Sequence, residues 1–108
     1  MMPKIKEVRD IIAIRELTYI SDNGQRERAL IEIGKPYKFT DEGDYLCPYR
    51  VSSESYEHLF GSVGIDSFQA LELSMGTMKS ELIYWLRKKG GSFEFLGEAG
   101  NGLEQENA

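Results

Sequence analysis

One stretch limits how this chain can fold more than any other: residues 64–91, GIDSFQALELSMGTMKSELIYWLRKKGG. Asp66 is a favoured N-cap residue, and Gln69 three positions later makes a variant of the capping box. A basic run at residues 87–89 suits the negative end of a helix dipole, and Gly90 then stands where a C′ glycine is expected. The stretch therefore predicts one long helix.

Apolar residues recur along this predicted helix at spacings of three and four, which places them on one stripe. They are Phe68, Leu71, Met75, Met78, Leu82 and Trp85 or Leu86. Because the stripe is the face that packs, both methionines are expected in the core. Gly76 interrupts the helix at a cost of about 1 kcal/mol relative to alanine. We therefore expect it to allow the close approach of a strand or to mark a bend.

The N-terminal half of the chain has the pattern of a β-hairpin. Residues 11–20, IIAIRELTYI, are rich in β-branched side chains and lack glycine and proline, which favours a strand. Asn23 and Gly24 suit the two central positions of a type I′ turn. The return strand, RERALIEIG at residues 26–34, alternates Ala29, Ile31 and Ile33 with Arg28, Leu30 and Glu32.

A loop and a third strand follow the hairpin. Residues 34–44, GKPYKFTDEGD, have the composition of a loop, and a strand begins near Tyr45. Pro48 within that strand has no N–H to donate. It should therefore lie at an edge, at a bulge, or with that position directed away from a neighbour.

Two further strands are expected, one before the helix in the sequence and one after it. The segment YEHLFGSVG at residues 56–64 is the fourth strand, with Gly61 as the candidate for a bulge. The segment SFEFL after the helix is the fifth, and period-two alternation places Phe93 and Phe95 on one face.

Together these elements predict an α+β domain with an antiparallel sheet of about five strands, in the order ββββαβ, and one long helix packed on one face. A chain of 108 residues suits a single core. We expect residues 1–96 to form that domain. Residues 97–108, GEAGNGLEQENA, are small, polar and acidic, and are expected to be a disordered tail.

Two blocks of the sequence resemble a known family. GDYLCPYRV at residues 43–51 and GIDSFQAL at residues 64–71 are similar to paired motifs of small bacterial proteins that carry a domain of unknown function, the DUF6968 type. The departures are Tyr45, where tryptophan is frequent, and Ile65, where valine is. The resemblance implies the strand and helix order above, and it implies no established activity.

Charge and composition narrow the classes of partner. With 13 Lys and Arg against 18 Asp and Glu, the net charge of −5 repels a phosphate backbone, so nucleic acid is not expected. No stretch approaches the roughly 18–20 apolar residues of a membrane span, and the charged N-terminus does not resemble a signal peptide. A lone cysteine fits a reducing compartment, so we expect a cytoplasmic protein.

Cys47, next to Pro48, is the first candidate for chemistry. With one histidine in the chain, a Cys and His zinc set cannot be completed, so no metal site is expected. A nucleophilic thiol would need a base, and His58 on the adjacent predicted strand is the candidate. The alternative, which we favour, is that Cys47 is a small buried apolar residue.

Arg50 is the second candidate. Beside the acidic loop at residues 40–44 it would usually make a structural ion pair, and the alternative is a clamp for a carboxylate or phosphate. That loop lacks the ligand spacing of a calcium site. Asp66 and Gln69 are explained by capping, and no cofactor motif is present.

Geometry suggests the functional hypothesis. A helix is about 10–12 Å wide and strands lie about 4.8 Å apart, so one helix covers two or three strands. The first strand is apolar on both faces, with Ile12, Ile14 and Ile20 on one and Ile11, Ala13, Leu17 and Tyr19 on the other. The second face of the sheet would be left bare, and sheet-to-sheet packing in a homodimer is the simplest way to cover it. We therefore expect a non-catalytic interaction domain that forms a homo-oligomer through its sheet or binds another protein.

Two alternatives remain open. An immunity or antitoxin role against a basic toxin would suit the small size and acidic charge. A small-molecule or anion-binding protein would instead need a pocket between sheet and helix, and no cofactor is expected in either case. The residues that would line such a pocket are Tyr45, Tyr49, Arg50, His58 and Trp85.

Overall fold

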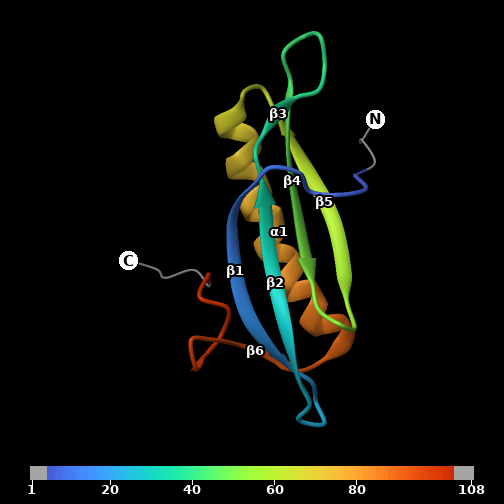
Figure 1. The fold of residues 1–108 in the computed structure, drawn as a ribbon, viewed down its shortest axis with the longest axis vertical. Helices are drawn as coiled ribbons and strands as arrows, with labels where there is room; N and C mark the ends of the chain where they lie inside the picture. Colours follow the sequence, from blue (N-terminus) through green and yellow to red (C-terminus); the bar gives the residue numbers. More distant parts are fainter. Residues whose placement is uncertain (1–4, 104–108) are drawn as a thin grey trace.

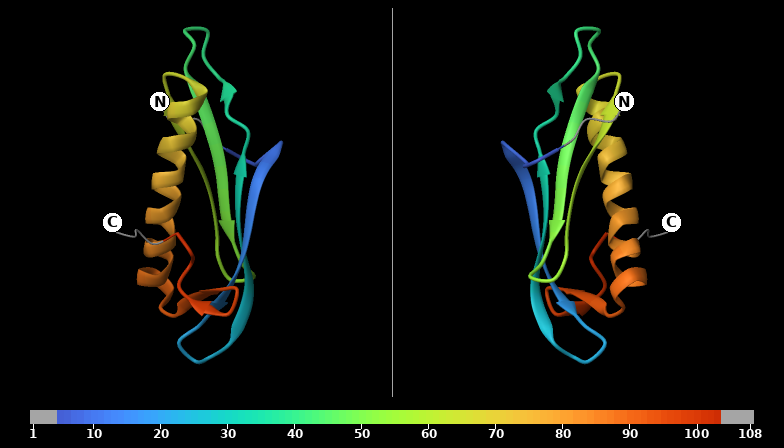
Figure 2. Two further views of the ribbon diagram at one scale, coloured as in Figure 1. Left: turned by 90° about the vertical axis from the view of Figure 1, so that its left-hand side faces the viewer. Right: turned by 90° about the vertical axis from the view of Figure 1, so that its right-hand side faces the viewer.

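The computed structural model describes residues 5–103. Its elements are β1 (Ile11–Ile20), β2 (Arg26–Gly34), β3 (Tyr37–Lys38), β4 (Tyr45–Ser52), β5 (Glu57–Gly64), α1 (Ser67–Lys89), β6 (Ser92–Phe95) and β7 (Glu98–Ala99). All seven strands join one antiparallel sheet, and α1 packs on one of its faces against β4 and β5 (Figures 1 and 2). The predicted fold class is confirmed, with β3 and β7 as additional two-residue strands.

Pro48 lies at a break in the ladder beside β4. Both β2 and β3 pair with the same side of β4, and residues 34–36 between them stand opposite only Cys47 and Pro48. Of the three placements expected for Pro48, the structure shows the irregular one, with three residues opposite two. A bulge at Gly61 is wrong, because the β4–β5 register runs without a break and pairs Gly61 with Pro48.

The segment of residues 5–10 explains Gly61 instead. It crosses the sheet on the face turned away from α1 (Figure 1). A Cβ atom at Gly34 would lie 2.7 Å from Cγ1 of Val8, and one at Gly61 would lie 2.6 Å from Cδ1 of Ile5. These two glycines let the crossing segment lie directly on the sheet.

The helix begins and ends as predicted. Asp66 accepts a hydrogen bond from the Gln69 N–H at 2.8 Å, and the Gln69 side chain accepts from the Ile65 N–H at 2.8 Å. Gly90 ends the helix at φ 74°, and its N–H donates to the Leu86 carbonyl at 2.7 Å. Within residues 5–103 no helix has the length and hydropathy of a membrane span.

The buried stripe of α1 differs from the predicted one at its start. Its buried residues are Ala70, Ser74, Met78, Leu82 and Trp85. Phe68 is 75% exposed, so its predicted place in the core is wrong. α1 first meets the sheet at Ala70, because a Cβ atom at Gly64 would lie only 2.4 Å from the Ala70 nitrogen. Phe68 lies two positions before Ala70, about 200° away around the helix, so it does not face this contact.

Gly76 has no close neighbour. The helix continues through it, and apart from its chain neighbours and the adjacent backbone of α1 no described atom lies within 4 Å of where its Cβ would be. The predicted close approach of a strand is therefore wrong.

The core lies between α1 and the facing side of β1, β2 and β4. It contains Trp85 with no exposed surface, stacked on Tyr56 at 4.5 Å between ring centroids and edge-on to Phe93 at 4.9 Å. Phe95 packs at the edge of the same cluster, so the shared face predicted for Phe93 and Phe95 is confirmed. The Tyr19 hydroxyl donates to the Gly90 carbonyl at 2.7 Å.

Part of the expected tail belongs to the sheet. β7 pairs with β6, and the Gly100 N–H donates to the Phe93 carbonyl at 2.8 Å. A disordered tail that starts at Gly97 is therefore wrong for residues 97–103, and residues 104–108 lie outside the described residues. Leu96 and Gly97, with φ values of 53° and 82°, make the tight turn between the two short strands.

Candidate functional site

The five candidate ligand-binding residues do not line one pocket. Tyr49 and Trp85 lie in the filled core with 1% and 0% of their surfaces exposed, and Tyr45 packs at its margin. Arg50 projects from the opposite face of β4, while the His58 side chain is 41% exposed at the rim of the helix side. Only Tyr49 and His58 meet at a common hollow.

Arg50 is held by two carboxylates from neighbouring strands. Its Nη1 lies 3.3 Å from Oε1 of Glu32 on β2, and its Nε lies 2.7 Å from Oε2 of Glu57 on β5. The ion pair expected of this arginine is present, but its partners are not in the acidic loop at residues 40–44. Because the guanidinium already faces two carboxylates, an anionic ligand would have to compete with both.

The hollow beside Tyr49 contains a group that the sequence analysis missed. Glu81 accepts a hydrogen bond from the Tyr56 hydroxyl, and its Oε1 lies 3.4 Å from Nε2 of His58. Burial, and then Glu81 itself, raise the pKa of Tyr56. Glu81 follows Met78 by three residues and precedes Trp85 by four. Its charge on the apolar stripe of the helix is therefore the sequence feature that could have identified it as a candidate.

This hollow has a volume of about 360 Å³ and is also lined by Phe60, Thr77, Ser80 and Tyr84. Burial raises the pKa of Tyr49 at its floor, so that phenol stays protonated. The arrangement offers hydroxyl groups, one carboxylate and one imidazole at an open surface.

Cys47 is part of the core, as favoured above. It has no exposed surface, its Sγ lies 3.5 Å from the Gly34 carbonyl oxygen, and burial raises the pKa of the thiol. The β4–β5 register pairs Cys47 with Ser62, whereas His58 pairs with Val51 four positions away. The two residues therefore do not form a nucleophile and base pair. Among residues 5–103 no group of His, Cys, Asp and Glu side chains could hold a metal ion.

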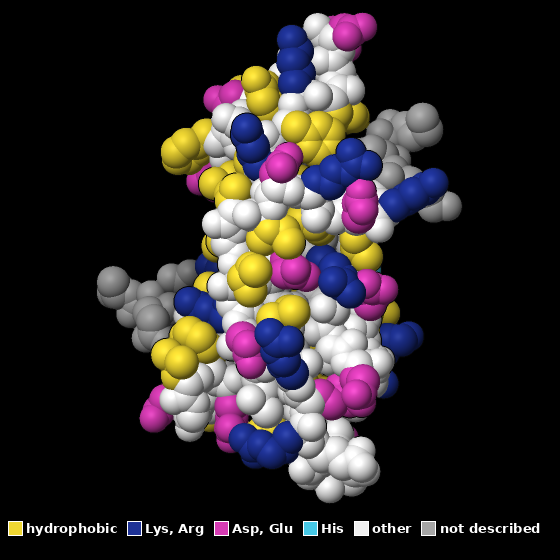
Figure 3. Space-filling model, viewed as in Figure 1, with side chains coloured by type: hydrophobic (Ala, Val, Ile, Leu, Met, Phe, Trp, Pro, Cys, Tyr) yellow, Lys and Arg dark blue, Asp and Glu magenta, His cyan; other side chains and the backbone are white. Residues whose placement is uncertain are grey.

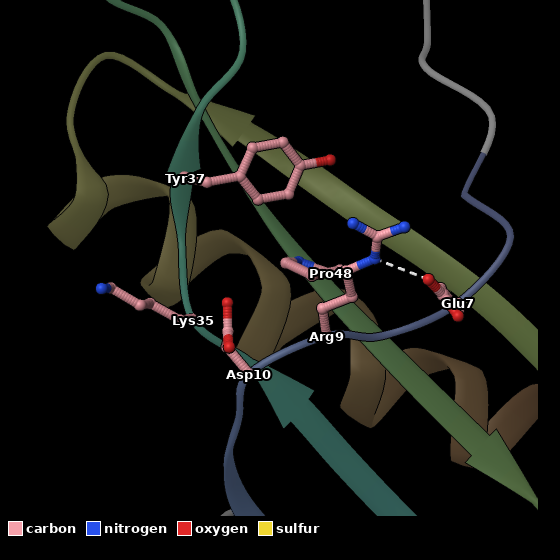
Figure 4. A pocket seen from close by; sticks show the side chains of 6 residues that line it. All are labelled: Glu7, Arg9, Asp10, Lys35, Tyr37 and Pro48. Atoms are coloured by element: carbon pink, nitrogen blue, oxygen red, sulfur yellow. Dashed lines mark hydrogen bonds and ion pairs between the residues drawn. The ribbon is translucent and has the colours of Figure 1, made fainter.

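A second hollow, of about 410 Å³, lies where the crossing N-terminal segment meets β3 and β4 (Figure 4). Arg9 and Glu7 pair with each other at one side, Lys35 and Tyr37 lie at the other, and Pro48 lies between them. Glu7 raises the pKa of the exposed Arg9. The charge of Arg9 is thus balanced by Glu7, just as the charge of Arg50 is balanced by two carboxylates.

The outer edge of β1 is the third feature. β1 pairs with β2 between Ile11 and Ile20, with a register shift at Ile12, and on its other side β6 covers only Thr18–Ile20. Within residues 5–103 no strand pairs with that side of Ile11–Leu17, which forms the outer edge of the sheet in Figure 1, and residues 101–103 lie beside it on the helix side. Ile11, Ile12 and Ile14 are 41%, 54% and 61% exposed there. Unpaired backbone with exposed isoleucines is a template for another strand.

Comparison with known families identifies the chain. The sequence model of the family described as Domain of unknown function (DUF6968) matches residues 13–105. The chain belongs to the DUF6968 family. Comparison with curated proteins and with solved structures gives no match.

The two motifs that suggested the family lie together in this DUF6968 domain. Residues 43–51 include most of β4, and residues 64–71 include the N-cap and first turn of α1. Ser74, one turn further on, donates to the Cys47 carbonyl of β4 at 2.6 Å. In the DUF6968 domain these motifs therefore build the junction of helix and sheet.

Proposed function

We propose that this DUF6968 domain is a non-catalytic protein-interaction domain that works as a homo-oligomer through its sheet. The observation that carries the proposal is the unpaired edge of β1 at Ile11–Leu17, with its three exposed isoleucines. Monomeric proteins usually cover, shorten or charge such an edge, because it otherwise recruits further strands. Here three of the seven free residues are exposed isoleucines, and the two charged ones, Arg15 and Glu16, already have partners in Asn101 and Arg28.

The edge of the sheet suits association better than its open face. That face carries ion pairs between Glu16 and Arg28 and from Arg50 to Glu32 and Glu57, and the N-terminal segment covers its other end. Figure 3 shows basic and acidic side chains among the apolar ones on this side of the molecule. Burying them face to face would require desolvation of several charges.

A non-catalytic role is supported by the contacts of the side chains that could otherwise act in catalysis. The Cys47 thiol is enclosed in the core, Arg50 is paired with two carboxylates, and the Glu81 carboxylate serves Tyr56 and His58. Because Cys47 is the single cysteine of the chain and its thiol is enclosed, it suits a reducing compartment, and this supports a cytoplasmic setting.

A small-molecule binder is the second candidate function. The open hollow of about 360 Å³ beside Tyr49, His58 and Glu81 favours it. A basic protein partner, as in an immunity role, is supported by the net charge of −5.

The test is the mass of the native chain by light scattering, compared with two matched variants. We expect twice 12.3 kDa for the native chain. Ile14→Lys places a charge at the β1 edge and should give a monomer, whereas Ile83→Lys, on the exposed side of α1, should leave the dimer intact. Ile83 is the matched control because it is 53% exposed against 61% for Ile14. A native monomer, or a dimer that only Ile83→Lys dissociates, contradicts the proposal.

A further inference from the structure

We infer that the β1 edge pairs with the same edge of a second copy of the chain, antiparallel, about a two-fold axis that lies midway between the two copies of Ile14. The inference rests on the proposed function and adds the partner strand and its register. An antiparallel pair of identical strands is self-complementary about a two-fold axis, so one surface serves both copies.

The length of the free edge points to the centre of the pairing. β1 has ten residues, and β6 covers the last three of them, which leaves the seven residues Ile11–Leu17. β6 itself ends at Phe95 and turns away at Leu96 and Gly97, so it closes one end of this gap. A symmetric pairing that uses the whole gap in both copies is centred on its middle residue, Ile14.

Charge selects the same register. Directly opposed residues of antiparallel strands point to the same face, and like charges directly opposite each other are destabilising. A pairing centred on Ala13 would bring Asp10, which directly precedes β1, towards Glu16. A pairing centred on Arg15 or on Glu16 would oppose that residue with itself.

The pairing centred on Ile14 opposes no like charges. It sets Ile14 against its own copy, Ile12 against Glu16 and Ala13 against Arg15. Arg15 is already held on the helix side, where its guanidinium lies 4.0 Å from the Phe95 ring centroid and donates to the Asn101 carbonyl. The most exposed isoleucine of the edge therefore lies opposite its own copy.

An apolar hollow on the helix side supports an interface at this edge. It has a volume of about 160 Å³ and lies between α1 and β1, because α1 packs on β4 and β5. Its lining includes Ala13, Ile33, Met75 and Leu103. A two-fold axis perpendicular to the sheet keeps both helices on one side, so the hollows of the two copies would adjoin across the new strand pair.

The outer side of α1 is the competing surface. Leu73, Ile83 and Tyr84 are 44%, 53% and 51% exposed there, beside the open Gly76. A helix surface offers no unpaired backbone groups, because those of the helix interior are satisfied within it. The β1 edge offers both apolar side chains and backbone partners, which is why we place the second copy there.

Disulfide cross-linking tests the register. Ile14→Cys should form a cross-linked dimer under mild oxidation, because opposed strand residues have Cα atoms about 4.5–5.5 Å apart. Ile12→Cys alone should not, because its two copies would be four positions apart, roughly 13 Å along the strands. A mixture of Ile12→Cys and Glu16→Cys chains should cross-link to each other. The native chain is the control, since Cys47 is fully buried.

The outcomes separate the inference from the proposed function. A native dimer that does not cross-link through Ile14→Cys, or that cross-links through Ile12→Cys alone, overturns the register and leaves the interaction domain standing. A native monomer overturns both. Cross-linking of Ile14→Cys together with the mixed pair, and not of Ile12→Cys alone, supports the register.

Discussion

The Ser74 hydroxyl donates to the backbone carbonyl of Cys47 at 2.6 Å and accepts from the backbone N–H of Ser62 at 3.0 Å. One buried side chain of α1 thus connects to two adjacent strands, β4 and β5. All three residues are buried, so the loss of this hydroxyl would remove a hydrogen-bond partner from two buried backbone groups.

We expect Ser74→Ala to lower the free energy of unfolding by about 1–3 kcal/mol, the cost of leaving buried polar groups unpaired. Urea unfolding measures it. Ser80→Ala on the exposed side of the same helix is the control and should change stability by less than about 0.5 kcal/mol. Equal effects of the two substitutions would contradict the role assigned to Ser74.

Two glycines should respond to alanine in opposite directions. At Gly64 the new Cβ would lie 2.4 Å from the Ala70 nitrogen, so α1 would have to shift, and we expect a loss of about 1–3 kcal/mol. At Gly76 the Cβ meets nothing, and the gain in helix propensity should stabilise by up to about 1 kcal/mol. Thermal unfolding of the two variants tests both signs. A destabilised Gly76→Ala chain would show that this glycine has a structural role in α1.

Cys47 should react slowly with an alkylating reagent in the native protein. The thiol has no exposed surface, and burial raises its pKa, so both access and the thiolate fraction are low. The native and urea-unfolded chains are compared at the same pH. Native labelling as fast as that of the unfolded chain would mean that the core around Cys47 opens readily.

The domain should lose stability in alkali. Burial raises the pKa of Cys47, Tyr19, Tyr49 and Tyr56, so each group keeps its proton to a higher pH in the folded chain than in the unfolded one. Each contribution is complete below the unfolded pKa and is lost as the pH rises towards the folded pKa. The free energy of unfolding should therefore fall above pH about 8.5 for the thiol and about 10 for the phenols. Urea unfolding from pH 7 upward measures this, and a flat profile would contradict it.

Glu81→Gln should lower the pKa of Tyr56. Burial is the larger cause of the raised pKa and would remain, but the hydrogen bond to a carboxylate and its negative charge would be lost. The absorbance of tyrosinate on alkaline titration follows this group. Glu72→Gln, on the exposed side of α1, is the control and should leave the titration unchanged. An unaltered titration in Glu81→Gln would show that the carboxylate does not act on Tyr56.

The elements that could be predicted are those whose signals are local. The N-cap at Asp66, the C′ glycine at Gly90 and the hairpin around Gly24 each depend on residues close in sequence. Their bounds in the structure follow these residues, and the alternation in β2 likewise places Ala29, Ile31 and Ile33 inside. The type I′ turn predicted for the hairpin is wrong, because Gly24 has a positive φ of 87° but Asn23 does not, and residues 21–25 form a five-residue loop closed by the Ser21 N–H bond to the Gln25 carbonyl.

The predictions that were wrong concern residues whose surroundings depend on contacts between distant segments. Phe68 fits the apolar period, but α1 meets the sheet at Gly64 through Ala70, and Phe68 lies on another side of the helix and is 75% exposed. Gly61 has the composition of a bulge, but it is small because Ile5 crosses over it. Neither reason is visible within a short window of sequence.

The candidate site was less predictable than the fold. The sequence indicated that Arg50 would be paired and that Cys47 would be buried, but it did not indicate which carboxylates Arg50 meets. That depends on the register of three strands, which brings Glu32 and Glu57 to either side of it. The free edge of β1 also depends on how far β6 extends, which is a matter of chain length rather than residue type.

The N-terminal segment has a consequence for the order in which the domain assembles. Val8 and Ile5 contact Gly34 and Gly61, which lie on β2 and β5 and are brought together only through β4. The segment that comes first in the chain can therefore dock only after three later strands have aligned. By the same argument this segment can detach from the sheet without breaking any strand pair. We therefore expect the local unfolding of lowest free energy in the native state to occur at residues 5–8.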